Sequence, residues 1–218
     1  MLGGPFRGMR YVSEAQGSVL IPKLLGIYEK ELNPTIEGLV RGNFPRIYVI
    51  GAGEGYYAAG MALRNPGAQV VAYEANEAAH KLIREVVERN AVTGRVAVHG
   101  LCSDADMRSL PGGSLVIMDV EGAEEHLLDP ASFSGLRDCT ILFEAHFSPA
   151  KMQSGILARF ANSHTITRIN SEVRRWSDVE SLPLPLVFYI RRNIGLWLDE
   201  MRGGTMQWYL MSPKRNIS

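Results

Sequence analysis

The sequence has little cysteine, no excess of either charge and no long apolar run. Its 218 residues include two cysteines, Cys102 and Cys139, which fit a reducing compartment and form no disulfide framework. The 23 basic and 23 acidic side chains cancel, which disfavours a strongly basic nucleic-acid surface. Apolar runs such as Leu115 to Met118 are far shorter than a membrane span of roughly 20 residues. No secretory leader is apparent in residues 1–7. We therefore predict a cytoplasmic protein without nucleic-acid or membrane partners.

The composition is that of an ordinary globular chain, with 46% hydrophobic and 21% charged residues. The first 45 residues differ from the rest, because residues 20–32 and 35–40 carry helical spacing after a glycine-rich lead. Asn33-Pro34 is predicted to separate these two helices. We predict two parts, an N-terminal helical appendage or lid at 1–45 and a main domain at 46–218.

From residue 46 onward, short apolar runs alternate with helical patterns. This alternation predicts an α/β fold with a mostly parallel sheet and helices on both faces, whose ligands bind at the carboxyl ends of the strands. Strands are expected at 46–50, 69–73, 95–99, 114–118, 140–144, 164–169 and 206–211, and helices at 56–64, 76–90, 121–128 and 149–160.

Three glycines, Gly51, Gly53 and Gly55, lie between the first expected strand and its helix. Glycine there permits a tight turn and a close approach of a ligand to the backbone, next to the positive end of a helix. Tyr56 occupies the third glycine position of the dinucleotide fingerprint, which disfavours NAD and FAD. The alternative is a turn that needs glycine for its shape alone.

Acidic residues follow the next two strands. Glu74 ends the second strand, where a carboxylate can accept both hydroxyls of a ribose. Asp104 follows the third strand and could receive an adenine amino group, or it could simply form a turn. Together with the glycines, these acids indicate a nucleoside-containing ligand.

Four motifs follow one another along the chain. They are Val-Ile-Gly-Ala-Gly-Glu-Gly at 49–55, Val-Ala-Tyr-Glu at 71–74, Asp-Val-Glu-Gly-Ala-Glu at 119–124 and Phe-Glu-Ala-His at 143–146. In this order they resemble class I S-adenosylmethionine-dependent methyltransferases of the FkbM type. Members of that family are associated with O-methylation of hydroxyls on sugars and natural products.

The resemblance implies a Rossmann-like, seven-stranded, mostly parallel sheet and S-adenosylmethionine as cofactor. It further implies an O-methyltransferase with a small-molecule or glycan acceptor, and it leaves a homodimer open. One departure is Val49, where many such enzymes carry an acid that helps to anchor the cofactor amine. The implied cofactor residues are Gly51, Ala52, Gly53, Glu54, Gly55, Glu74, Ala75, Cys102, Asp104 and Asp119, with Leu101 beside the adenine.

Transfer to a hydroxyl requires a general base near the ends of the fourth and fifth strands. We predict His146 as this base, because an imidazole titrates near neutrality, with Asp119 and Glu144 as further catalytic residues. A structural histidine is the alternative. Glu121 and Glu124 are interpreted as first-turn acids of a helix. These acids and His146 could also bind a divalent cation, but their spacing matches no metal signature and no metal ligand is predicted.

Two further groups have open interpretations. Tyr11, Lys23 and Tyr28 form either a lid over the pocket or a helix contact that covers the sheet. The C-terminal tryptophans and arginines form either a sugar- or anion-binding wall or a helix with a solvated face. They are Trp176, Trp197, Trp208, Arg174, Arg175, Arg191 and Arg192. At the level of function, the alternative to an enzyme is a cofactor-binding protein that acts through a partner.

Overall fold

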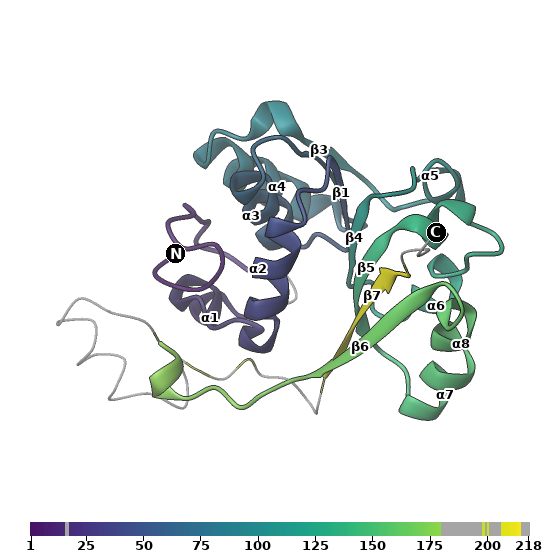
Figure 1. Ribbon diagram of the computed structural model, residues 1–218. Helices are drawn as coiled ribbons and strands as arrows, with labels where there is room; N and C mark the ends of the chain where they lie inside the picture. Colours follow the sequence, from purple (N-terminus) through teal and green to yellow (C-terminus); the bar gives the residue numbers. More distant parts are fainter. Residues whose placement is uncertain (16–17, 180–197, 199, 201–205, 215–218) are drawn as a thin grey trace.

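A seven-stranded sheet forms the centre of the molecule (Figure 1). The structure is a computed structural model that describes residues 1–15, 18–179, 198, 200 and 206–214. The strand order is β3-β2-β1-β4-β5-β7-β6, in which β7 runs antiparallel to both of its neighbours and the other pairings are parallel. The strands are β1 (Arg46–Ile50), β2 (Gln69–Tyr73), β3 (Val96–His99), β4 (Leu115–Met118), β5 (Thr140–Ala145), β6 (His164–Asn170) and β7 (Gln207–Pro213). The predicted α/β fold with a mostly parallel sheet is confirmed.

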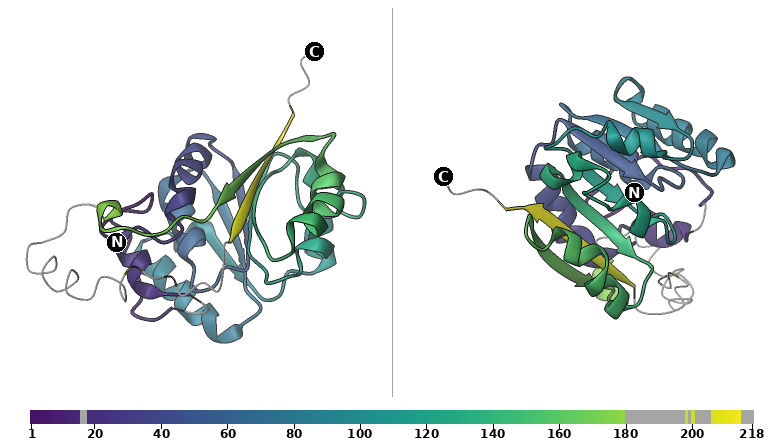
Figure 2. Two further views of the ribbon diagram at one scale, coloured as in Figure 1. Left: turned by 90° about the horizontal axis from the view of Figure 1, so that it is seen from below. Right: turned by 90° about the vertical axis from the view of Figure 1, so that its right-hand side faces the viewer.

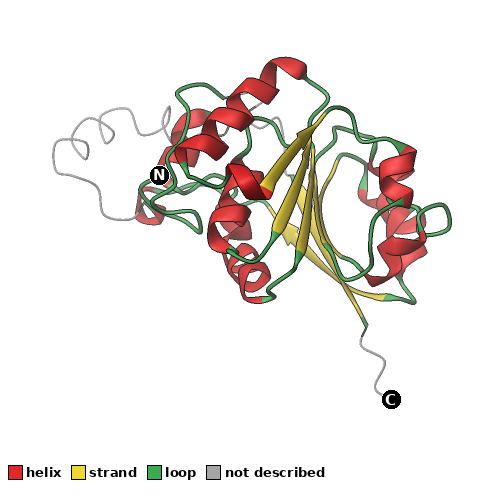
Figure 3. Cartoon of the chain, turned by 90° about the horizontal axis from the view of Figure 1, so that it is seen from above, coloured by secondary structure: helices red, strands yellow, loops and turns green. Residues whose placement is uncertain are grey.

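Helices cover both faces of this sheet (Figure 3). In β1, Ile47 and Val49 contribute to one hydrophobic cluster and Tyr48 and Ile50 to the other, because side chains alternate along a strand. The central strand β4 is buried throughout, as a strand covered on both faces must be. The first cluster includes α2 (Asn33–Arg41), α3 (Tyr56–Arg64) and α4 (Glu77–Arg89), and the second includes α5 (Asp104–Arg108), α6 (Glu124–Leu127), α7 (Pro149–Ser154) and α8 (Ile156–Phe160).

Local sequence accounts for where these helices begin and end. The Asn76 side chain caps α4 by accepting a hydrogen bond from the backbone N–H of Ala78 at 3.0 Å. The single helix expected over 149–160 is wrong, because Gly155 separates α7 from α8. The described residues also include four short 3-10 helices, which are η1 (Lys30–Leu32), η2 (Thr93–Arg95), η3 (Ser134–Asp138) and η4 (Trp176–Asp178). Across the described part of the chain, no helix combines the length and the apolar character that crossing a membrane demands.

The first helices are divided at a different place from the one predicted. Helix α1 (Leu20–Leu25) ends at Gly26, whose φ of 79° is the left-handed conformation typical of a glycine after a helix. Pro34 instead lies in the first turn of α2, where a backbone N–H has no partner within the helix, so its absence in proline costs nothing. The prediction that Asn33-Pro34 separates the helices is therefore wrong.

The N-terminal segment packs on α3. In the left view of Figure 2 its purple trace lies beside the blue helices. Phe6 is fully buried and contacts the rings of Tyr56 and Tyr57 edge-on, with centroids 5.1 and 6.1 Å away. Gly60 makes room for it, since a Cβ there would lie 2.6 Å from the Phe6 ring. Residues 1–45 thus share a hydrophobic cluster with the sheet, while the boundary at residue 45 stays a prediction.

Candidate functional site

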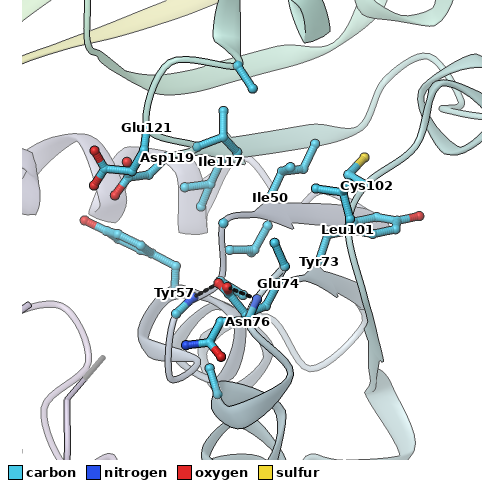
Figure 4. Close-up of a pocket in the computed structure, with 18 of the residues that line it drawn as sticks. Ile50, Tyr57, Tyr73, Glu74, Asn76, Leu101, Cys102, Ile117, Asp119 and Glu121 are labelled. Atoms are coloured by element: carbon cyan, nitrogen blue, oxygen red, sulfur yellow. Dashed lines mark hydrogen bonds between the residues drawn. The ribbon is translucent and has the colours of Figure 1, made fainter. Parts of the chain in front are cut away.

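A cavity of about 690 Å³ lies at the carboxyl ends of β1, β2 and β4 (Figure 4). The strand order reverses between β1 and β4, and α/β sheets bind ligands at such a reversal. Nine of the ten predicted cofactor residues line this cavity: Gly51, Ala52, Gly53, Glu54, Glu74, Ala75, Cys102, Asp104 and Asp119. The tenth, Gly55, caps the start of α3. The lining also includes residues that were not predicted to bind the cofactor, among them Ser18, Lys23, Tyr28, Tyr57, Asn76, Glu121 and His126.

The glycine loop is shaped by contacts inside the protein. Gly51 has a φ of +80°, and a Cβ on it would lie 1.6 Å from the backbone oxygen of Asp119. The backbone N–H groups of Gly51 and Ala52 both donate to the carbonyl of Tyr73, at 2.9 Å. Gly51 is therefore needed to bring the loop after β1 against the loop after β4. Most backbone N–H groups of the loop donate to groups of the protein itself. The loop therefore contributes to ligand binding mainly by letting the ligand come close to the backbone.

Glu74 is held at the end of β2 by two backbone N–H groups. Its Oε2 accepts from Gly53 at 2.7 Å and its Oε1 accepts from Asn76 at 2.8 Å, as the dashed lines in Figure 4 mark. Each carboxylate oxygen keeps a free lone pair, because an oxygen of an ionised carboxylate accepts up to two hydrogen bonds. The side chain is thus fixed in place and can still accept hydroxyls from a ligand in the cavity.

The side of the cavity near α5 combines an apolar rim with a polar edge. Leu101 is a large apolar side chain that is 76% exposed and lines the cavity. Burial raises the pKa of the Cys102 thiol to about 12, so this cysteine is a neutral wall residue. The Asp104 carboxylate pairs with His126 Nε2 at 2.7 Å. Asp104 also opens α5, so its position serves the helix as well as the cavity.

The N-terminal segment forms another wall through a buried ion pair. Lys23 Nζ lies 2.5 Å from Glu54 Oε1, and both side chains are almost fully buried. The Tyr11 hydroxyl donates to the same oxygen at 2.8 Å, and Lys23 also lies 4.6 Å from the Tyr28 ring centroid. Glu54, a predicted cofactor residue, therefore anchors the N-terminal segment to the glycine loop.

At the other end of the cavity, the loops after β4 and β5 gather carboxylates around one imidazole. His146 Nδ1 lies 2.5 Å from Glu124 Oε1, and its Nε2 lies 3.6 Å from Asp119 Oδ1 and 3.4 Å from Glu121 Oε2. Carboxylate oxygens of Asp119 and Glu144 and a nitrogen of His146 lie within 4.8 Å of one another. The three predicted catalytic side chains, Asp119, Glu144 and His146, are thus brought together.

This crowding changes the protonation of the cluster. The hydrogen bond to Glu124 raises the pKa of His146 to about 9, although burial opposes it. Burial and neighbouring acids raise the pKa of Asp119 to about 6. Both shifts follow from the closeness of these acids to the imidazole, and the role of His146 as the base stays a prediction.

Several functional side chains were missed or misinterpreted. Glu124 lies in the first turn of α6 as expected, whereas Glu121 precedes that helix. The burial of Glu124 and its bond to His146 were missed. Tyr57 projects toward Asp119 and Glu121 from the start of α3 (Figure 4). A tyrosine directly after a glycine loop was the available signal for it.

Two members of the C-terminal group of tryptophans and arginines are buried. Trp208 is fully buried in β7, and Arg174 is buried between Glu31 and Glu200 at 2.7 Å from each. Both residues therefore serve packing, and the sugar- or anion-binding interpretation is wrong for them. Trp197, Arg191 and Arg192 lie outside the described residues.

Solved structures share this fold at low sequence identity. An S-adenosylmethionine-dependent O-methyltransferase from Thermotoga maritima has a TM-score of 0.53 and 13% identity, over 92% of this chain and 73% of its own. An O-methyltransferase from Bacillus cereus, in complex with S-adenosylhomocysteine, has a TM-score of 0.51 and 14% identity, over 96% and 84%. Precorrin-6y C5,15-methyltransferase from Geobacter metallireducens has a TM-score of 0.50 and 10% identity, over 82% and 87%. No family model and no curated protein sequence matches the chain. These likenesses establish the fold.

Proposed function

We propose that this protein is an S-adenosylmethionine-dependent methyltransferase that transfers a methyl group to a hydroxyl of a small molecule or sugar. The observation that carries the proposal is Glu74, which is fixed at the end of β2 and faces a cavity that ends at Asp119. The similarity of fold to methyltransferases, one of them in complex with S-adenosylhomocysteine, supports it. The finer assignment to the FkbM type rests on the four sequence motifs.

The residues around the cavity match the three parts of the cofactor. Glu74 would accept the ribose hydroxyls, and Leu101, Cys102 and Asp104 would flank the adenine. The methionine part would lie over the glycine loop, where Gly51 and Gly53 permit close approach. This order directs the methyl group toward the end of the cavity that Asp119 marks.

The reaction is an in-line displacement in which the acceptor oxygen forms a bond to the methyl carbon. The carbon–sulfur bond breaks, its electron pair stays on sulfur, and the hydroxyl proton passes to a base. Positioning of the reactants can supply roughly 7–11 kcal/mol of the lowered barrier. His146 is the proposed base, with Glu124 on Nδ1 orienting Nε2 toward Asp119.

A non-catalytic cofactor-binding protein is the second candidate, and Val49 favours it. This side chain is 2% exposed in β1 and supplies no charge for the cofactor amine. His146→Ala separates the two candidates, since an enzyme would lose turnover and keep its cofactor affinity. A binding protein would show no turnover in either form.

Calorimetric titration with S-adenosylmethionine, S-adenosylhomocysteine and NAD tests the proposal. We expect both sulfur compounds to bind, and Glu74→Ala to weaken them at least about tenfold, which corresponds to about 1.4 kcal/mol. Glu77→Ala is the matched control, because this exposed acid lies outside the cavity lining. Binding of NAD alone, or equal loss in both variants, would contradict the proposal.

A further inference from the structure

We propose that Asp119, Glu144 and His146 bind a divalent metal ion at the acceptor end of the cavity. The site itself stands on the geometry of these side chains. Its role, which is to hold an acceptor with two neighbouring oxygens, rests on the function proposed above. With the ion bound, His146 Nε2 is a ligand and no longer the base, and the rim carboxylate of Glu121 beside the site takes the acceptor proton. No metal signature is visible in the sequence, because Asp119 follows β4 while Glu144 and His146 lie at the end of β5, and the donors meet only in the folded sheet.

The donor atoms of the three side chains converge on one point. One carboxylate oxygen from each acid and one imidazole nitrogen all lie within 4.8 Å of one another. Ligands that bind one ion at about 2.0–2.3 Å lie up to about 4.6 Å apart when they face each other across it. Small side-chain rotations would therefore complete the coordination.

The imidazole is oriented as a metal-binding histidine is. Glu124 holds His146 Nδ1 at 2.5 Å with a side chain that is 0% exposed, and this leaves Nε2 directed at Asp119. The distances of 3.6 and 3.4 Å from Nε2 to Asp119 and Glu121 exceed those of good hydrogen bonds. Metal-binding histidines characteristically donate their other N–H to a carboxylate in this way.

Unsatisfied carboxylate oxygens supply an independent reason for a cation. Within the described chain, Asp119 Oδ1 and Glu124 Oε2 are shielded from solvent and have no hydrogen-bond partner. Such oxygens are costly to bury unless a donor or a cation meets them. Asp119 Oδ1 is the oxygen that faces His146 Nε2, so the unsatisfied acceptor points into the proposed site.

The donor set suggests which ion and which acceptor belong there. Two carboxylates with one imidazole suit a first-row ion such as Mn²⁺ better than Ca²⁺, which takes oxygen ligands. Three protein ligands leave coordination positions for other oxygens. Glu121 stands at the rim, 83% exposed, beside these positions. An acceptor with two adjacent oxygens, such as a vicinal diol, fits the remaining space chemically.

Titration of the chelator-treated protein with Mn²⁺, followed by electron paramagnetic resonance of the free ion, tests the site. We expect one saturable site in the wild-type protein and at least a tenfold loss of affinity in Asp119→Asn and His146→Ala. Glu125→Gln is the matched control, since this neighbouring acid is exposed and pairs with Lys151 instead. If the wild-type protein showed no saturable Mn²⁺ binding, the proposal would be overturned. It would also be overturned if Asp119→Asn and His146→Ala bound Mn²⁺ as tightly as Glu125→Gln.

A parallel titration of the same samples with S-adenosylhomocysteine separates the two proposals. Binding of S-adenosylhomocysteine without Mn²⁺ binding would overturn the metal site and leave the proposed function standing. Mn²⁺ binding without S-adenosylhomocysteine binding would do the reverse. Retained S-adenosylhomocysteine affinity in His146→Ala, whose side chain does not line the cavity, would also show that this variant is folded.

Discussion

The two ends of the cavity are built in different ways. At the glycine end, the cavity wall consists mainly of backbone groups, and a single carboxylate, Glu74, accepts hydrogen bonds from two backbone N–H groups. At the transfer end, carboxylates from the segment after β4 and from β5 surround one imidazole, His146, and leave buried oxygens unsatisfied. The first end relies mainly on backbone groups and the second on side chains. Hydroxyls and close backbone contact suit the first end, and a proton or cation suits the second.

Gly51→Ala would disrupt the contact between the loops after β1 and β4, where the two ends meet, and should lower the free energy of unfolding the most. A Cβ at φ +80° would lie 1.6 Å from the Asp119 backbone oxygen. Strain of this kind together with a backbone clash predicts a loss of more than about 3 kcal/mol in the free energy of unfolding. Urea denaturation measures it. Gly100→Ala is the control, because a Cβ there meets nothing within 4 Å. Equal losses in both variants would contradict the account.

Lys23→Met would break the wall that borders the glycine end. It leaves the Glu54 carboxylate buried without its ammonium partner, which predicts a loss of about 3–5 kcal/mol in unfolding free energy. The double variant Lys23→Met, Glu54→Gln should recover part of that loss, because the buried charge is gone. Lys151→Ala removes an exposed pair and should cost far less than Lys23→Met. If Lys23→Met cost no more than Lys151→Ala, the pair would not anchor this wall.

Glu124→Gln would alter the transfer end alone. An amide holds the His146 ring more weakly than a carboxylate, so Mn²⁺ affinity should fall about 10- to 100-fold. Affinity for S-adenosylhomocysteine should stay unchanged, because Glu124 does not line the cavity. Calorimetry measures both affinities in one preparation. A parallel fall of both would mean that the two ends are not separable.

Asp104→Ala should have the smallest effect. The carboxylate shares an exposed pair with His126, so the free energy of unfolding should change by less than about 1 kcal/mol. Loss of one polar contact to the adenine predicts a fall in S-adenosylhomocysteine affinity of up to about tenfold. Unchanged affinity would assign Asp104 to the start of α5 alone.

Most of the sheet could be predicted from the sequence, because alternating or fully apolar runs depend on a few consecutive residues. The same holds for Gly51 and Glu74, whose meaning follows from their place after a strand. The helix break at Gly26 was missed because Pro34 is compatible with the first turn of a helix. Contacts between distant segments carry no local signal, so the burial of Glu124 against His146 could not be predicted.

A reciprocal titration tests most directly whether the two ends are independent. Wild-type protein, Glu74→Ala and Glu144→Gln are each titrated with S-adenosylhomocysteine and with Mn²⁺. The account predicts that Glu74→Ala weakens only S-adenosylhomocysteine and that Glu144→Gln weakens only Mn²⁺, by at least about tenfold each, or about 1.4 kcal/mol. The account would be contradicted if one variant lost affinity for both ligands, or if both variants bound both ligands as tightly as the wild-type protein.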